Sequence, residues 1–119
     1  METARDIAKG LAQPAARLRK NIPAVYDAYG AMSTAVLADG ALPAKVKELV
    51  ALAIAATREC DGCISAHARG AARQGATEAE VAEAMGVVIM MNGGPGTVWG
   101  PRVLAAYREF AEPEAGTAG

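Results

Sequence analysis

Residues 42–67 decide the fold and read LPAKVKELVALAIAATRECDGCISAH. Between Val46 and Ala56 this stretch is apolar almost all round a helical cylinder, whereas a surface helix carries a single apolar stripe. We therefore predict a helix that is buried on several sides. Because a small bundle offers limited cover, we expect another subunit to bury part of this helix or of the helix beside it.

The composition of the chain agrees with a helical fold. Its 119 residues suffice for one domain, and 52% of them are hydrophobic while only 4% are aromatic. Abundant alanine and glycine favour close-packed helices over an aromatic-rich sandwich of sheets. We predict an all-α protein with a single domain over residues 1–119, and we expect Met85, Met90 and Met91 to fill its core.

Capping and breaking residues set the expected helix boundaries. Asn21 suits a cap position before Pro23, and Thr77 with Glu80 matches a capping box. The glycines within residues 92–96 are expected to break regular structure. The predicted helices cover residues 1–20, 23–38, 43–56, 61–74, 77–91 and 101–111, of which the first is peripheral, and the tail over residues 112–119 is expected to be frayed.

Charge and hydropathy argue against two classes of partner. The net charge of −1, from twelve basic and thirteen acidic residues, leaves no large positive field for nucleic acid or anionic lipid. No stretch reaches the roughly 20 apolar residues of a membrane span, and the amino terminus lacks the apolar run of an export signal. We therefore expect a soluble cytoplasmic protein that binds neither nucleic acid nor membrane.

The end of the opening stretch carries the most reactive side chains. Cys60 and Cys63 are the only cysteines and His67 is the only histidine. At positions i, i+3 and i+7 of a helix they share one face within about 60°. Helical cysteines three residues apart have Cα atoms about 5 to 5.5 Å apart, so the pair can oxidise without refolding. In a reducing compartment such a pair is expected to be a cycling disulfide or part of a metal ligand set rather than a permanent structural disulfide.

The residues alone do not decide which of the two cysteines is the attacking thiol. The helix dipole favours a thiolate at Cys60, whereas His67 is placed to take the proton of Cys63. Glu48 is either a charged first-turn residue facing water or a partner of His67. On a helical hairpin the two lie about 8 Å apart along the axis, a gap that side chains plus one water can cross.

Two other interpretations of the cysteines compete with a redox-active pair. Structural zinc usually takes four protein ligands, and the chain has no second cysteine pair and no second histidine. An inert buried thiol pair beside a core histidine also fits, because free cysteine packs as a small hydrophobe. A thioredoxin-type fold is disfavoured because no strand pattern accompanies the cysteines.

The run from Leu42 to Ala53, followed by Cys60, Cys63 and His67, closely resembles the carboxymuconolactone decarboxylase family, and in particular its alkylhydroperoxidase D-like branch. The resemblance covers about residues 22–110. It implies a bundle of about six helices that assembles as a trimer or hexamer, with thiol peroxidase or disulfide reductase activity.

The resemblance also implies residue roles. Cys63 matches the thiol that attacks peroxide, Cys60 matches the thiol that resolves the intermediate and meets the reductant, and Glu48 and His67 match a proton relay. Peroxidase members carry His or Tyr just before the second cysteine, where this chain has Gly62, so proton delivery or substrate fit is expected to differ. No bound cofactor or metal is expected; electrons would come from an external dithiol such as dihydrolipoamide or a lipoyl adapter protein.

Three functions follow as hypotheses. The first is a peroxide reductase or disulfide oxidoreductase acting on a small hydroperoxide through Cys63 and Cys60. The second is a lactone decarboxylase-type enzyme that transfers protons with Glu48 and His67, although the cysteines argue against it. The third is a non-enzymatic, redox-sensitive homo-oligomer.

Overall fold

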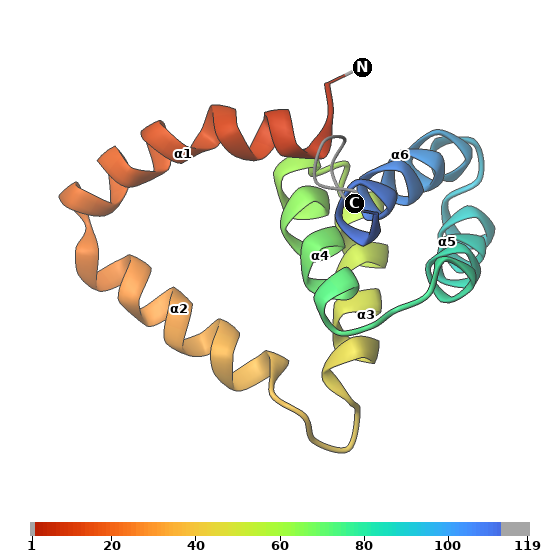
Figure 1. The fold of residues 1–119 in the computed structure, drawn as a ribbon, viewed down its shortest axis with the longest axis horizontal. Coiled ribbons are helices and arrows are strands. Elements are labelled where there is room, and N and C mark those ends of the chain that lie inside the picture. The colour runs from red at the N-terminus through yellow and green to blue at the C-terminus, as the bar shows by residue number, and fades with distance from the viewer. Residues whose placement is uncertain (1, 113–119) are drawn as a thin grey trace.

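Six α-helices account for most of residues 2–112, the part of the chain that this computed structural model describes (Figure 1). No strand occurs among these residues, which confirms the all-α class. The helices are α1 (Ala4–Asn21), α2 (Pro23–Leu37), α3 (Ala44–Thr57), α4 (Asp61–Arg73), α5 (Glu78–Asn92) and α6 (Gly94–Ala111). None of these helices is long and apolar enough to cross a membrane.

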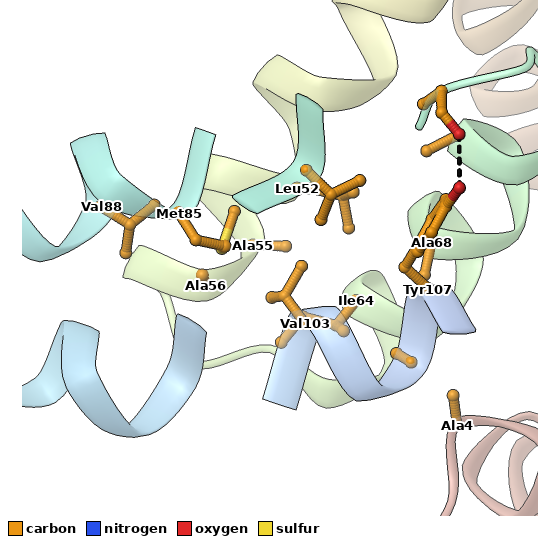
Figure 2. Packing of buried hydrophobic residues seen from close by; sticks show 14 residues of the cluster. Ala4, Leu52, Ala55, Ala56, Ile64, Ala68, Met85, Val88, Val103 and Tyr107 are labelled. Atoms are coloured by element: carbon orange, nitrogen blue, oxygen red, sulfur yellow. Dashed lines mark hydrogen bonds between the residues drawn. The ribbon is translucent and has the colours of Figure 1, made fainter. Parts of the chain in front are cut away.

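Helices α3 to α6, called the bundle below, contain nearly all of the core. Leu52 of α3, Val81 of α5 and Val103 of α6 are fully buried and belong to one hydrophobic cluster. Helix α4 contributes mainly small side chains such as Ala68 to this core (Figure 2), so it can lie close to its neighbours.

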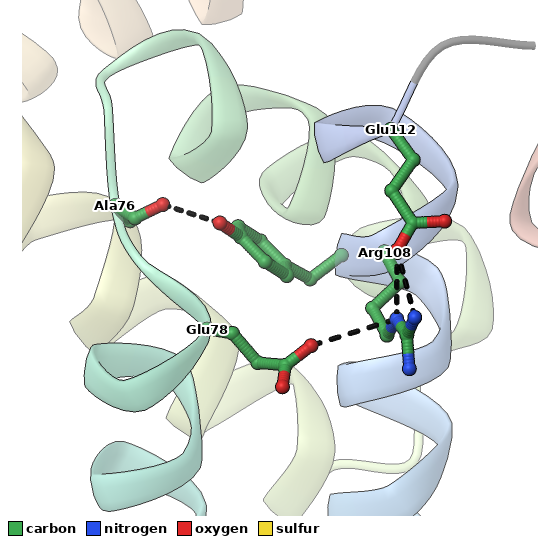
Figure 3. Close-up of polar contacts among 5 residues, drawn as sticks. Ala76, Glu78, Arg108 and Glu112 are labelled. Carbon is green, nitrogen blue, oxygen red and sulfur yellow. Dashed lines mark hydrogen bonds and ion pairs between the residues drawn. The ribbon is translucent and has the colours of Figure 1, made fainter.

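Helix α6 makes polar contacts with neighbouring segments at one end of the bundle (Figure 3). The buried hydroxyl of Tyr107 donates to the carbonyl of Ala76, in the connection between α4 and α5. Arg108 lies 3.5 Å from Glu78 at the start of α5 and 2.8 Å from Glu112. These ion pairs are exposed and contribute little to stability, whereas the tyrosine bond satisfies a buried carbonyl.

Helices α1 and α2, called the arm below, project from the bundle and return to it (Figure 1). Ala4 is the buried residue of α1, and α2 has none. The start of α1 is tied to the bundle because the Glu109 carboxylate accepts from the amides of Ala4 (2.7 Å) and Arg5 (3.2 Å). Ser65 of α4 also donates to the carbonyl of Ala4 at 2.7 Å.

The other end of the arm is held by one lysine. The Lys47 ammonium group donates to the carbonyl of Val36 at 2.8 Å and to that of Ala38 at 2.6 Å. Lysine thus satisfies carbonyls that the end of α2 leaves without helical partners. The arm is therefore fixed at both ends by polar contacts while its middle packs against little of the bundle.

Two predicted boundaries are wrong. Asn21 does not cap the second helix; it ends α1 and its side-chain amide donates to the carbonyl of Arg17 at 2.9 Å, although Pro23 does open α2. The last helix begins at Gly94 rather than near Pro101, and only Gly93, with φ of 69°, separates it from α5.

Close packing explains why the glycine-rich segment continues as helix. A Cβ at Gly96 would lie 2.7 Å from the Cα of Ile89, so α5 and α6 approach at a distance that only glycine permits. This tertiary contact outweighs the helix-breaking tendency of the local sequence.

Two of the predicted core methionines are also misplaced. Met85 is buried, but Met90 and Met91 are 73% and 74% exposed, because they lie on the face of α5 that points away from the bundle. The tail predicted to be frayed, residues 112–119, lies outside the described residues except for Glu112, which caps α6.

Candidate functional site

The connection between α3 and α4 places Cys60 at the amino end of α4. Glu59 adopts the left-handed region with φ of 54°, which costs about 1 kcal/mol for a residue other than glycine. Cys60 follows in extended conformation as the cap of α4, and its sulfur accepts from the amide of Cys63 at 3.3 Å. The sulfur therefore lies where free amides and the helix dipole favour negative charge, as the sequence predicts.

The two cysteines form a disulfide across the first turn of α4. Their Cα atoms lie 5.3 Å apart, within the range expected from helical spacing. Cys60 is half-buried and Cys63 is exposed, so the pair is not enclosed in the core. Oxidation is therefore compatible with the fold, and a reagent in solution can reach the pair.

His67 lies one turn beyond Cys63 and makes a direct contact with Glu48. Its Nδ1 is 2.9 Å from Oε2 of Glu48, which joins α4 to α3 within one chain. The glutamate is only 6% exposed, so it is not a first-turn residue facing water. Of the two alternatives that the sequence leaves open for Glu48, the contact with His67 is the one present, and it is direct rather than bridged by a water.

The expected axial offset of about 8 Å between Glu48 and His67 is too large, because it assigns helical rise to residues that lie outside the two helices. Glu48 lies about 14 Å before the end of α3 at Thr57, and His67 lies about 9 Å after the start of α4 at Asp61. Residues 58–60 form the turn between the helices and reverse the chain. The remaining offset of about 5 Å is short enough for the two side chains to span without water.

The contact fixes how the imidazole can exchange protons. A hydrogen bond between Nδ1 and an ionised carboxylate requires the proton on Nδ1. The neutral ring then keeps its lone pair on Nε2, which can accept a proton from a thiol or deliver one to a leaving group. Because the His67 side chain is 30% exposed, the ring can take part in exchange with solvent or substrate.

An apolar cavity of about 450 Å³ borders His67. Met32 and Val36 line it from α2, and Val50 and Ile54 line it from α3. The part of α2 in this site is not among the residues expected from the sequence. Its apolar spacing is readable in the sequence, but its position beside His67 depends on how the arm returns to the bundle.

No group of three or more His, Cys, Asp or Glu side chains within residues 2–112 is arranged to hold a metal ion. The two sulfurs are bonded to each other rather than available as thiolate ligands. The site thus combines a cysteine pair at the start of α4 with the Glu48–His67 contact one turn further along.

Comparison with known proteins places this arrangement in a family. The model of the carboxymuconolactone decarboxylase family matches residues 23–112. A carboxymuconolactone decarboxylase family protein from Legionella pneumophila, solved in its apo form, has the same fold with a TM-score of 0.87 and 33% identity. That likeness covers 92% of this chain and 97% of the solved one.

Two curated relatives are similar over most of their length. An uncharacterized protein of Cupriavidus necator is 40% identical over 85 residues, which is 71% of this chain and 75% of the relative. Uncharacterized protein 4 in the cox locus of Paracoccus denitrificans is 38% identical over 86 residues, which is 72% of this chain and 78% of the relative. The chain therefore belongs to the carboxymuconolactone decarboxylase family.

Proposed function

We propose that this protein is a thiol-dependent peroxide reductase or disulfide oxidoreductase of the alkylhydroperoxidase D-like type. The observation that carries the proposal is the reachable Cys60–Cys63 pair at the amino end of α4, one turn from the Glu48–His67 contact. A reversible disulfide and a proton-exchanging group are the two components that thiol peroxidase chemistry requires.

In the proposed reaction His67 takes the proton of the Cys63 thiol and becomes an imidazolium, and the resulting thiolate attacks the terminal oxygen of a hydroperoxide. The O–O bond breaks, Cys63 becomes a sulfenic acid, and the departing alkoxide takes a proton from the imidazolium of His67 to leave as alcohol. The Cys60 thiol then attacks the sulfenic sulfur, a disulfide forms and water leaves. Exposure of Cys63 and its position one turn before His67 support its role as the attacking thiol.

An external dithiol closes the cycle. Its first thiolate attacks the disulfide at Cys60, the sulfur that the family resemblance assigns to the reductant, and its second thiol resolves the mixed disulfide. Two electrons and two protons thereby return to the cysteine pair. Dihydrolipoamide, free or on a lipoyl adapter protein, is the donor that the resemblance suggests.

Glu48 and the apolar cavity have supporting roles in this proposal. Glu48 holds the proton on Nδ1 of His67, so that Nε2 serves the reacting thiol. The cavity beside His67 is lined mainly by hydrocarbon side chains, which supports an organic hydroperoxide rather than a highly polar substrate.

Peroxide titration of the reduced protein tests the mechanism. One equivalent of hydroperoxide should consume two thiols per chain, in protein that contains no zinc. Cys63→Ser should abolish dithiol-dependent peroxide consumption, while Cys60→Ser should consume one thiol and accumulate a sulfenic acid that dimedone traps. A Cys63→Ser variant that turns over at the parental rate would remove this mechanism.

A second candidate is a lactone decarboxylase-type enzyme, and the Glu48–His67 contact favours it because this pair needs no sulfur to transfer a proton. It predicts full activity on a γ-carboxylactone after Cys60 and Cys63 are both changed to Ala. Loss of that activity, or its absence in the parent protein, would exclude it.

A further inference from the structure

Gly70 lies against the carboxylate of Glu48. A Cβ at this position would stand 2.5 Å from Oε2, 2.6 Å from Cδ and 2.8 Å from Oε1 of the glutamate. Real Cβ atoms essentially never approach other heavy atoms closer than 3.0 Å. The carboxylate therefore occupies the volume that any side chain at position 70 would need.

Backbone conformation does not explain this glycine. The glycines of residues 2–112 that adopt positive φ are Gly75 and Gly93, and Gly70 is not among them. It lies inside α4, where glycine is less favourable than any residue except proline. The space beside Glu48 is thus the feature of the structure that requires glycine at this position.

Gly70 and His67 border the same carboxylate from one helix. His67 lies three residues before Gly70, so both face α3 across the hairpin. The imidazole provides the hydrogen bond to Oε2, and the bare backbone at Gly70 provides the room in which that oxygen lies. Glu48 is almost fully buried between the helices, so its carboxylate has little space to move aside.

We infer that Gly70 is a positioning residue for the Glu48–His67 pair. Its missing side chain lets the carboxylate lie against α4 within hydrogen-bond distance of Nδ1. A methyl group there displaces the carboxylate and leaves the imidazole without the partner that fixes its proton. The role of Gly70 in turnover rests on the proposed function, but its effect on the pair does not.

The first test observes the imidazole itself in Gly70→Ala. Because His67 is the only histidine, its ring nitrogens and their protons give a single set of NMR signals in untagged protein. We expect a hydrogen-bonded Nδ1 proton in the parent and loss of this signal in Gly70→Ala. Gly86→Ala is the matched control, because Gly86 is also inside a helix and a Cβ there meets no atom within 4 Å.

The second test separates the effect on Glu48 from a general packing effect. Gly70→Ala should lower the melting temperature by at least roughly 5 °C in the parent. In a Glu48→Ala background the clashing carboxylate is gone, so the same substitution should leave the melting temperature unchanged or raise it. Gly86→Ala should raise it slightly in both backgrounds.

Either of two results would overturn the inference. One is a Gly70→Ala protein that keeps the Nδ1 proton signal, and the other is an equal loss of melting temperature with and without Glu48. If Gly70→Ala does not fold, the double variant must fold for the inference to stand. Neither readout needs peroxide turnover, so an inactive parent would count against the proposed function and not against Gly70.

Discussion

The bundle and the arm use apolar side chains in different ways. The bundle encloses Leu52 and its neighbours completely, whereas α2 buries no residue and exposes a stripe formed by Val25, Tyr29, Met32 and Val36. The bundle is therefore held by its own core. The arm is held at its two ends: Ala4 packs into that core beside the hydrogen bonds to Glu109, and Lys47 binds the end of α2. The acid–base part of the candidate site lies where they meet, since Glu48 and His67 belong to the bundle and the cavity beside His67 is lined by both regions, although not by Cys60 or Cys63.

Core truncation should give the largest difference between the two regions. Leu52→Ala removes a fully buried side chain of the bundle and should lower the free energy of unfolding by about 2–5 kcal/mol. Met32→Ala, in the exposed stripe of α2, should cost less than about 1 kcal/mol in dilute solution. Urea unfolding of both variants measures this, and equal losses would mean that the arm shares the core of the bundle.

The next largest effect should be on the oligomeric state, and it should come from substitutions in the arm rather than in the bundle. We propose that a second copy of the chain covers the part of the α2 stripe formed by Val25 and Tyr29, because both side chains are left more than half exposed and neither lines the cavity beside His67. Sedimentation velocity should find a trimer or hexamer. Tyr29→Glu should shift it toward single chains, while Thr34→Glu on the opposite face of α2 should not. A parent protein that sediments as single chains would contradict the proposal.

Features that depend on a few neighbouring residues could be predicted from the sequence. The Thr77 capping box, with bonds of 2.9 and 3.1 Å, and the Cys60–Cys63 spacing are both confirmed, because each joins positions three residues apart on one helix. The all-α class followed for the same reason, from patterns that each helix carries within itself.

Features that depend on how helices meet could be predicted only in part. A contact between Glu48 and His67 is one of the alternatives that the sequence leaves open, but the distance of 2.9 Å could not be predicted. The offset between the two residues depends on the geometry of the turn, which the pattern of neither helix determines. The exposure of Met90 follows from which face of α5 meets the bundle. The need for glycine at position 70 could not be predicted from the neighbouring residues, because the carboxylate that fills the space beside it belongs to Glu48 on α3.

The stability contributions of the arm and the bundle can also be compared, with smaller expected effects, at the capping boxes that begin α1 and α5. Thr77→Ala removes the side chain that accepts from Glu80 at 3.1 Å at the start of α5, and should cost about 1 kcal/mol. Thr3→Ala makes the same change in the arm, where the Thr3 side chain accepts from the amide of Asp6 at 3.0 Å at the start of α1, and it should cost less. Glu109 still accepts two amides at the start of α1, so that helix end keeps part of its capping. Urea unfolding of both variants measures the two losses, and a larger loss for Thr3→Ala than for Thr77→Ala would contradict the prediction.

Acid should give the smallest effect, through the carboxylates of the same two boxes. Hydrogen bonds from Thr77 and the nearby Lys45 hold the pKa of Glu80 below its ordinary value of 4.5, and hydrogen bonds from Thr3 likewise lower the pKa of Asp6 from 3.8. Because folding favours the ionised forms, their contributions are complete above these ordinary values and are lost as the pH falls through the lower folded ones.

The consequence of that loss should differ between the regions. Protonation of Glu80 weakens the start of a bundle helix, so the stability difference between the parent and Glu80→Gln should shrink as the pH falls from about 6 to about 3. Protonation of Asp6 acts at the start of the arm, where it should speed amide hydrogen exchange in the first turn of α1 with little change in global unfolding. If protonation of Asp6 and protonation of Glu80 lowered the free energy of global unfolding equally, arm and bundle would unfold as one unit, which would contradict the prediction.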